Sequence, residues 1–178
     1  MVADTPSVVI RPYRKDDDAR GTHAAYRSAI IRTASADYEP VQISAWAGAE
    51  TINLQQWDTS RLAAHTFVAV TEERIAGFAD FLDEGLLDML FVHPDFSRRG
   101  IARLLISEVR REAAQAGLST LRTYASRTAR PAFEQFGFWV VAPRPDNVVG
   151  GQTVSNYEMQ CDLTTDLPFP GGDQHPSL

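Results

Sequence analysis

The most restrictive feature of the sequence is a strand–helix–strand unit in its second half. Residues 86–92 form a strand-like apolar run, residues 100–116 repeat apolar side chains at helical spacing, and residues 119–126 are strand-like again. A strand, a helix and a second strand form a crossover, which places the two strands parallel. The chain is therefore expected to contain a parallel pair at this point.

The segments around this unit predict antiparallel strands and helices. Strand-like runs at residues 66–71, 74–82 and 86–92 are joined by the short links "EE" and "DEG", so they predict a meander. Before them we expect a strand at residues 7–13, a helix to about residue 36 that carboxylates at residues 16–18 can cap, a short helix within residues 37–50 and an ambiguous stretch at residues 53–64. After the crossover we expect a short helix ending at Gly137 and two strands around a Pro/Gly-rich loop. This order indicates an α+β domain and excludes a doubly wound sheet.

Composition narrows the class of protein. The 178 residues suit one domain, which we place at residues 1–163, followed by a flexible tail at 164–178. The net charge of -6 argues against a general binder of nucleic acid or of an acidic membrane. The single cysteine, Cys161, excludes an internal disulfide and suits a reducing compartment, so with no signal peptide or apolar span in sight a cytoplasmic location is expected.

The corner between the strand and the helix of the crossover has the features of an anion site. Backbone amides that open a helix have no intrahelical acceptor, and Gly100 permits a close approach to them. Arg98 and Arg99 can add charge-assisted hydrogen bonds. No Gly-Lys-Ser/Thr follows, so this is not a P-loop, and a single glycine is no dinucleotide fingerprint. The alternative is a capped surface helix with solvated arginines.

The residues flanking this corner resemble the GNAT N-acetyltransferase superfamily. The strand pattern Leu-x-Val-x-Pro is met by Leu90, Val92 and Pro94, and the turn pattern Gln/Arg-x-x-Gly-x-Gly/Ala by Gly100 and Ala102, with Ser97 as a departure. The segment "ARPAFEQFGF" is similar to a second family motif, with Ala129, Glu134, Gly137 and Phe138 in register. "SADYEPVQISAWA" also resembles a subgroup of bacterial GNAT proteins.

The resemblance implies a GNAT-like fold: a mixed, mostly antiparallel, twisted sheet of about seven strands, flanked by helices, with a splayed parallel central pair. It implies acetyl-CoA as cosubstrate, with its pyrophosphate on the amides of residues 98–103 and its pantetheine arm along residues 90–92. Homodimers are common in the family. The cofactor-binding residues expected on this basis are Leu90, Phe91, Val92, Arg98, Arg99, Gly100, Ile101, Ala102, Arg103, Ser126 and Phe133.

Acetyl transfer to an amine needs a neutral amine, a stabilised oxyanion and a way for the thiolate to leave. A backbone N–H near Leu90 would polarise the thioester, by resemblance. Asp88 is the first candidate for the base, because it lies two residues before Leu90 and so on the same face of a regular strand. It can equally be a solvated carboxylate; Asp80, Asp83 and Glu84 are weaker candidates, and a water relay would reduce the need for any of them.

The general acid is where the sequence departs from the family. Phe133 replaces the usual tyrosine and cannot donate a proton. Tyr124 can substitute, or can simply pack on the sheet, and Ser126 can hydrogen-bond the cofactor. The thiolate can also leave without an acid, since thiols are fairly acidic. No cluster of metal ligands is present in the sequence.

Aromatic residues before the meander are candidates for the acceptor pocket. Tyr38, Trp46 and Trp57 lie in the region that lines this pocket in GNAT folds, and their alternative role is core packing. The leading hypothesis is an acetyl-CoA-dependent N-acetyltransferase acting on a primary amine of a small molecule or peptide. The alternatives are an acyl-CoA-binding sensor or scaffold without efficient catalysis, and a protein-interaction module with no cofactor.

Overall fold

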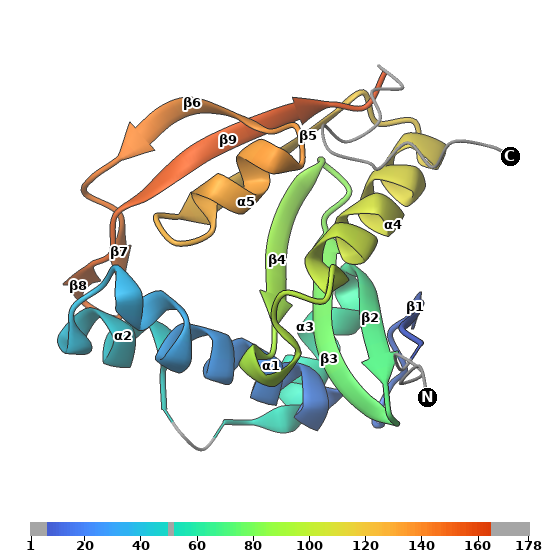
Figure 1. The fold of residues 1–178 in the computed structure, drawn as a ribbon, viewed down its shortest axis with the longest axis horizontal. Helices are drawn as coiled ribbons and strands as arrows, with labels where there is room; N and C mark the ends of the chain where they lie inside the picture. Colours follow the sequence, from blue (N-terminus) through green and yellow to red (C-terminus); the bar gives the residue numbers. More distant parts are fainter. Residues whose placement is uncertain (1–6, 50–51, 165–178) are drawn as a thin grey trace, which may run out of the picture.

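The computed structural model describes residues 7–49 and 52–164, which form one mixed sheet with helices on both faces (Figure 1). The strands of the main sheet are β1 Val9–Pro12, β2 His65–Thr71, β3 Arg74–Phe81, β4 Leu86–Val92, β5 Thr120–Ser126, β6 Trp139–Arg144 and β9 Asn156–Asp162. The α-helices are α1 Ala19–Arg32, α2 Pro40–Ala47, α3 Leu54–Ala63, α4 Ile101–Gln115 and α5 Arg130–Gln135. Short 3₁₀ helices cover Ala34–Ala36 (η1) and Pro94–Phe96 (η2).

The sheet has the strand order β1-β2-β3-β4-β5-β9-β6, and its central pair is parallel. All other neighbours in it are antiparallel. β4 and β5 pair at only two positions, Leu86 with Arg122 and Leu87 with Thr123, and then diverge. The predicted α+β fold with a splayed parallel pair is confirmed.

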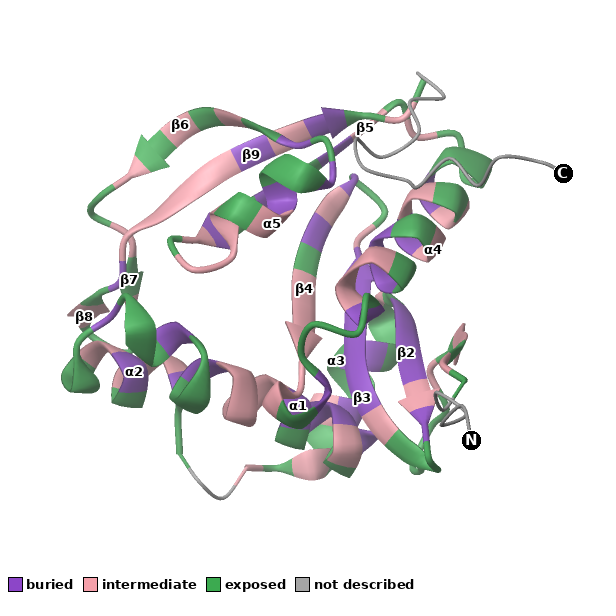
Figure 2. Cartoon of the chain, viewed as in Figure 1, coloured by how far each residue is buried: buried purple, intermediate pink, exposed green. Residues whose placement is uncertain are grey.

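The main core lies between one face of the sheet and the helices α4 and α5 that cover it (Figure 2). Five α4 residues on one stripe are almost completely buried, namely Ile101, Leu105, Ile106, Val109 and Ala113. Leu104 also lies at helical spacing from Ile101, but it is 42% exposed, whereas Ile106 is buried. The opposite face of β2 and β3 packs on α1 through Ala25, Val68 and Phe78.

Two segments differ from the predicted structure, and a third, the predicted tail, lies largely outside the described residues. The ambiguous stretch before β2 is the helix α3, and its N-cap Asn53 accepts a hydrogen bond from the Gln56 amide at 3.1 Å. The predicted Pro/Gly-rich loop holds a small hairpin of β7 Val148–Val149 and β8 Gln152–Thr153. The predicted tail lies outside the described residues from residue 165 onward, so the division at residue 163 stays a prediction.

The aspartates before α1 act differently from simple helix caps. Asp18 stands at the N-cap position, but its side chain makes no capping bond. Its buried carboxylate instead accepts two hydrogen bonds from the Arg11 guanidinium, at 2.6 and 2.8 Å, and one from the Arg14 amide at 2.7 Å. This ion pair therefore fixes the start of α1 to strand β1.

Candidate active site

The divergence of β4 and β5 exposes a strand edge inside the molecule. The His93 amide just after β4 donates to the Ala76 carbonyl of β3 at 2.8 Å, and the Met89 amide also points toward β3. Since amide directions alternate along a strand, the amides of Leu90 and Val92 point to the opposite edge. Among the described residues, β5 pairs with β4 only at Leu86 and Leu87, at the start of the strand. The edge can therefore accept an extended, amide-bearing ligand.

A cleft of about 430 Å³ runs along this edge to the start of α4. Its walls come from α1, β4, the β4–α4 corner and α5. Of the residues expected to bind the cofactor, it is lined by Leu90, Phe91, Val92, Arg98, Gly100, Ile101, Ala102, Arg103, Ser126 and Phe133. Sequence motifs some 40 residues apart therefore meet around one cavity.

The corner at Gly100 has the geometry of an anion cradle. Gly100 is the N-cap of α4 and has φ +75°, and the space that a Cβ would enter there is open. The first helical hydrogen bond runs from Leu104 N to the Gly100 carbonyl at 3.1 Å, so the preceding amides have no intrahelical acceptor. No side chain of the N-cap residue competes for them. The helix dipole adds partial positive charge at the same place.

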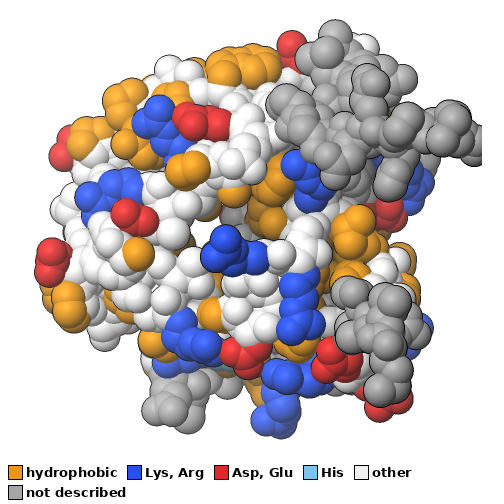
Figure 3. Space-filling model, in the orientation of Figure 1, with side chains coloured by type: hydrophobic (Ala, Val, Ile, Leu, Met, Phe, Trp, Pro, Cys, Tyr) orange, Lys and Arg blue, Asp and Glu red, His pale blue; other side chains and the backbone are white. Residues whose placement is uncertain are grey.

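The arginines of the corner divide into two groups. Arg98 and Arg103 line the cleft. Arg99 does not: its guanidinium stacks over Phe96 at 5.3 Å and lies 3.8 Å from Glu72. The expected direct contact of the Arg99 side chain with a cofactor is therefore not supported by its position. Figure 3 shows basic side chains at the centre and lower part of this face, and further ones toward its left and right sides.

The α5 side of the cleft is apolar at the position where the family motif has a tyrosine. The Phe133 ring is 4% exposed and packs edge-on against Phe138, with centroids 5.1 Å apart. The Ser126 hydroxyl oxygen accepts a hydrogen bond from the Ala129 amide at 3.0 Å, just before α5. Its own proton is left to donate toward the cleft, which it lines.

Asp88 occupies a β-bulge. Phe81 pairs with Leu87 and Asp80 with Met89, so Asp88 is one extra residue on β4. As a result Leu87 and Leu90 both pack in the main core, while Met89 packs on the α1 face. The expectation that Asp88 and Leu90 share a face by regular alternation is therefore wrong. The exposed Asp88 carboxylate instead acts on groups of the α1 face: burial raises the pKa of Tyr26 there, and the charge of Asp88 adds to the rise.

Tyr124 lies away from the cleft. Its side chain is 46% exposed on the outer face of β5, and the Arg144 guanidinium stacks over its ring at 4.1 Å. Neighbouring Thr123 and Ala125 point to the buried face instead. This position supports the alternative role of Tyr124, packing on the sheet. It does not support a role as proton donor in the cleft.

The three aromatic candidates for the acceptor pocket take different positions, and Trp57 packs with Ala25, Val68 and Phe78. Trp46 lines the cleft. Tyr38 does not: it is buried, its hydroxyl donates to the Ser155 carbonyl at 2.6 Å and it accepts from the Arg127 amide at 2.9 Å. Its ring packs against Trp46 with centroids 5.6 Å apart. Tyr38 therefore supports the pocket wall from behind.

Sequence reasoning underrated one polar pair beside the bulge. Asp80 was a minor candidate for the base, but its side chain is completely buried and forms an ion pair with the buried Arg61 of α3. An aspartate inside the otherwise apolar run "IAGFADFL" was the available signal. The partner was not readable, because α3 has no clear apolar stripe.

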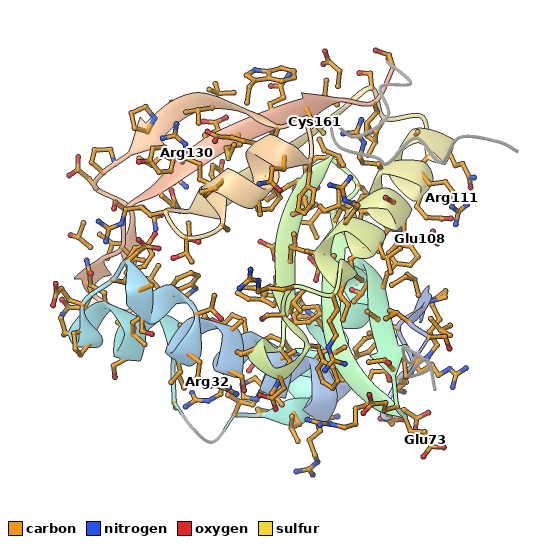
Figure 4. All side chains as sticks on the ribbon, in the orientation of Figure 1. Arg32, Glu73, Glu108, Arg111, Arg130 and Cys161 are labelled. Atoms are coloured by element: carbon orange, nitrogen blue, oxygen red, sulfur yellow. The ribbon has the colours of Figure 1, made fainter. Side chains whose placement is uncertain are left out.

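Cys161 is buried on β9, in the core against α5 (Figure 4). Burial raises the pKa of its thiol to about 11. Only about one thiol in a thousand is then ionised at pH 8, so a nucleophilic role is not supported.

We expect Ellman's reagent to find almost no reactive thiol in the native protein and one per chain in denaturant. Rapid labelling of the native protein would contradict this assignment.

Fold, open strand edge and cleft together define an acetyltransferase of the GNAT kind, and comparison with known proteins agrees. The family model of the acetyltransferase (GNAT) domain matches residues 34–161, so the chain belongs to this family of acyltransferase enzymes. Its relatives include the uncharacterized N-acetyltransferase YafP of Escherichia coli K12. The two are 35% identical over 135 residues, which cover 76% of this chain and 83% of YafP.

Solved structures extend the comparison to the whole fold. A GCN5-related N-acetyltransferase from Rhodopseudomonas palustris superposes with a TM-score of 0.81 at 28% identity, covering 91% of this chain and 98% of that one. YncA of Salmonella typhimurium, solved with its cofactor acetyl-CoA, gives 0.67 at 20% identity, over 91% and 97%. That identity shows the fold alone. Acetyl-CoA is the cosubstrate of GNAT enzymes.

The described residues hold neither a cluster of metal ligands nor a membrane-spanning helix. Within residues 7–49 and 52–164, no three His, Cys, Asp or Glu side chains gather in a way that could hold a metal ion. No helix in the same residues combines the length and apolar character needed to cross a bilayer.

Proposed function

We propose that this protein transfers an acetyl group from acetyl-CoA directly to a primary amine of a small molecule or peptide. The observation that carries the proposal is the single cleft that joins the open edge of β4 to the Gly100 corner. An anion cradle at one end and a free strand edge leading from it match a donor with a pyrophosphate and an amide-bearing arm.

The chain's own groups account for the donor side. The open amides at Gly100 and the cationic side chains of Arg98 and Arg103 suit the pyrophosphate. The edge amides of Leu90 and Val92 suit the pantetheine amides, and the Leu90 N–H is placed to hydrogen-bond a carbonyl oxygen that gains charge. Bound acetyl-CoA supplies an acyl group on a thiol of moderate acidity. Phe133 then matters less, because such a thiolate can leave unprotonated.

The acceptor side is the α1 face of the bulge. Asp88 is an exposed carboxylate there, two residues before Leu90 in the chain, so we assign it the removal of the amine proton, directly or through water. Trp46 forms part of the wall. The aromatic rings of Tyr26 and Phe91, with centroids 4.9 Å apart, lie beneath the same surface.

The proposal is tested by melting and turnover. At about 100 times Kd, acetyl-CoA stabilises the native state by about 2.7 kcal/mol, which raises the Tm of a chain of this size by roughly 5–10 °C. Thiol release is then followed over a panel of amines, amino acids and peptides. No shift at millimolar acetyl-CoA contradicts any cofactor role. A shift without turnover on any amine favours the sensor over the enzyme.

A further inference from the structure

A buried ion pair lies directly behind the bulge of β4. Arg61 of α3 is 6% exposed and Asp80 of β3 is 0% exposed, and the guanidinium donates a hydrogen bond to the carboxylate. The face of the Trp57 ring covers the guanidinium at 5.0 Å. Little solvent reaches the pair, so its charges act on the groups around them with little screening.

Both members of this pair contact the bulged strand. The second oxygen of the Asp80 carboxylate accepts the Met89 amide at 3.1 Å, and the Arg61 guanidinium lies 2.7 Å from the Met89 sulfur. In a regular ladder the Met89 amide would bond to a carbonyl of β3. Here the register shift between β3 and β4 removes that partner, and a side chain from β3 replaces it. The carboxylate is thus part of the bulge itself.

Stability alone is a poor explanation for this ion pair, because burying its two charges carries a desolvation penalty. Burial raises the pKa of the Asp80 carboxyl to about 7, against the opposing pull of Arg61. Arg61 also keeps a buried Nε that has no hydrogen-bond partner within the described structure. Buried ion pairs can often be exchanged for apolar residues with no loss of stability. The contacts of both residues with Met89 suggest instead that the pair holds the bulged strand in place.

We propose that Arg61 and Asp80 are positioning residues for acetyl transfer: they hold the Met89 amide, and so fix the bulge that turns Asp88 toward the acceptor and the Leu90 N–H toward the donor cleft. The inference rests on the proposed function. Asp88 immediately precedes Met89 and Leu90 follows it. A rotation of the Met89 peptide therefore moves both groups at once, the Asp88 side chain and the Leu90 N–H at the open edge of β4. Neither Arg61 nor Asp80 lines the cleft.

Two double variants separate positioning from charge. Arg61→Met with Asp80→Asn removes both charges but leaves an oxygen that can accept the Met89 amide. Arg61→Met with Asp80→Leu removes both charges and the acceptor. We expect the leucine variant to lose at least about tenfold in kcat while the KM for acetyl-CoA changes far less, because neither exchanged residue lines the cleft and the Gly100 corner is unaltered. The asparagine variant should recover most of that loss.

A structural control is available on the same helix. Asp58 of α3 is also buried, but its hydrogen bonds are with the segment between β1 and α1: it accepts the Tyr13 hydroxyl at 2.8 Å and the Asp16 amide at 3.3 Å. Asp58→Asn is expected to lower the Tm while leaving kcat unchanged. If kcat follows Tm in all three variants, Arg61 and Asp80 are only structural and the inference is overturned.

Amide hydrogen exchange gives a readout that does not require turnover. Protection of the Met89 amide should fall in the leucine variant and persist in the asparagine variant, whether or not an acceptor has been found. Unchanged protection in the leucine variant contradicts the inference even if the wild-type enzyme is active. Wild-type protein without turnover contradicts the proposed function instead, so the two failures are distinguishable.

Discussion

Asp88→Asn lowers kcat about 100-fold and leaves the KM for acetyl-CoA within about twofold of the wild-type value, because a positioned general base contributes about 10²- to 10⁴-fold. Asparagine keeps the size of the side chain but cannot take a proton from the amine. The exposed position of Asp88 on the bulge makes a folding defect from this exchange unexpected. Steady-state thiol release at saturating acetyl-CoA measures the effect.

The pH dependence of the defect identifies its cause. Alkyl ammonium groups lose their proton near pH 10, so at higher pH more of the acceptor is already neutral. The gap between Asp88→Asn and wild type should therefore narrow as pH rises. Asp83→Asn, on the exposed link between β3 and β4, is the matched control and should leave kcat unchanged. A kcat within twofold for Asp88→Asn would assign proton removal to another group or to water alone.

Gly100→Ala weakens acetyl-CoA binding about 100-fold. A Cβ at this position enters the open space at the mouth of α4 and keeps the pyrophosphate from the amides. Loss of about two charge-assisted hydrogen bonds at about 1.5 kcal/mol each corresponds to about a hundredfold in Kd. Isothermal titration of acetyl-CoA measures it directly.

Gly117 provides the control for backbone strain. It lies just beyond the other end of α4, has φ +85°, and likewise has open space where a Cβ would be. Alanine costs about 1–2 kcal/mol in this left-handed conformation at either position. Gly100→Ala and Gly117→Ala should therefore lose similar stability, while only the first loses affinity. Equal acetyl-CoA affinity in the two variants would place the pyrophosphate elsewhere.

Regular periodicity allowed most of the fold to be predicted from sequence. The bounds of β4 were predicted to the residue, and α4 to within one residue at each end, because polar links and turn residues clearly bound the two apolar runs there. α3 was ambiguous for a physical reason. It buries Asp58 and Arg61, and polar residues that are satisfied by partners elsewhere in the chain leave no apolar stripe to detect.

The parts of the site that depend on backbone groups could be predicted from the sequence. The parts that depend on the direction of a side chain were harder to predict. The Gly100 corner follows from a glycine at a helix start, so its place in the cleft was readable. A bulge adds one residue without a change in composition, and the face of Asp88 could not be deduced. Tyr38 and Tyr124 carry the same hydroxyl, but one is bonded in the interior and the other lies on an outer face.

The short pairing of β4 with β5 also has a mechanical meaning. Two residue pairs join the first four strands to the last three at one end of the gap. At the other end Tyr38 ties the segment before α2 to Ser155 and Arg127. The two halves of the sheet are therefore joined at both ends of the gap, and these two contacts limit how far the cleft can widen.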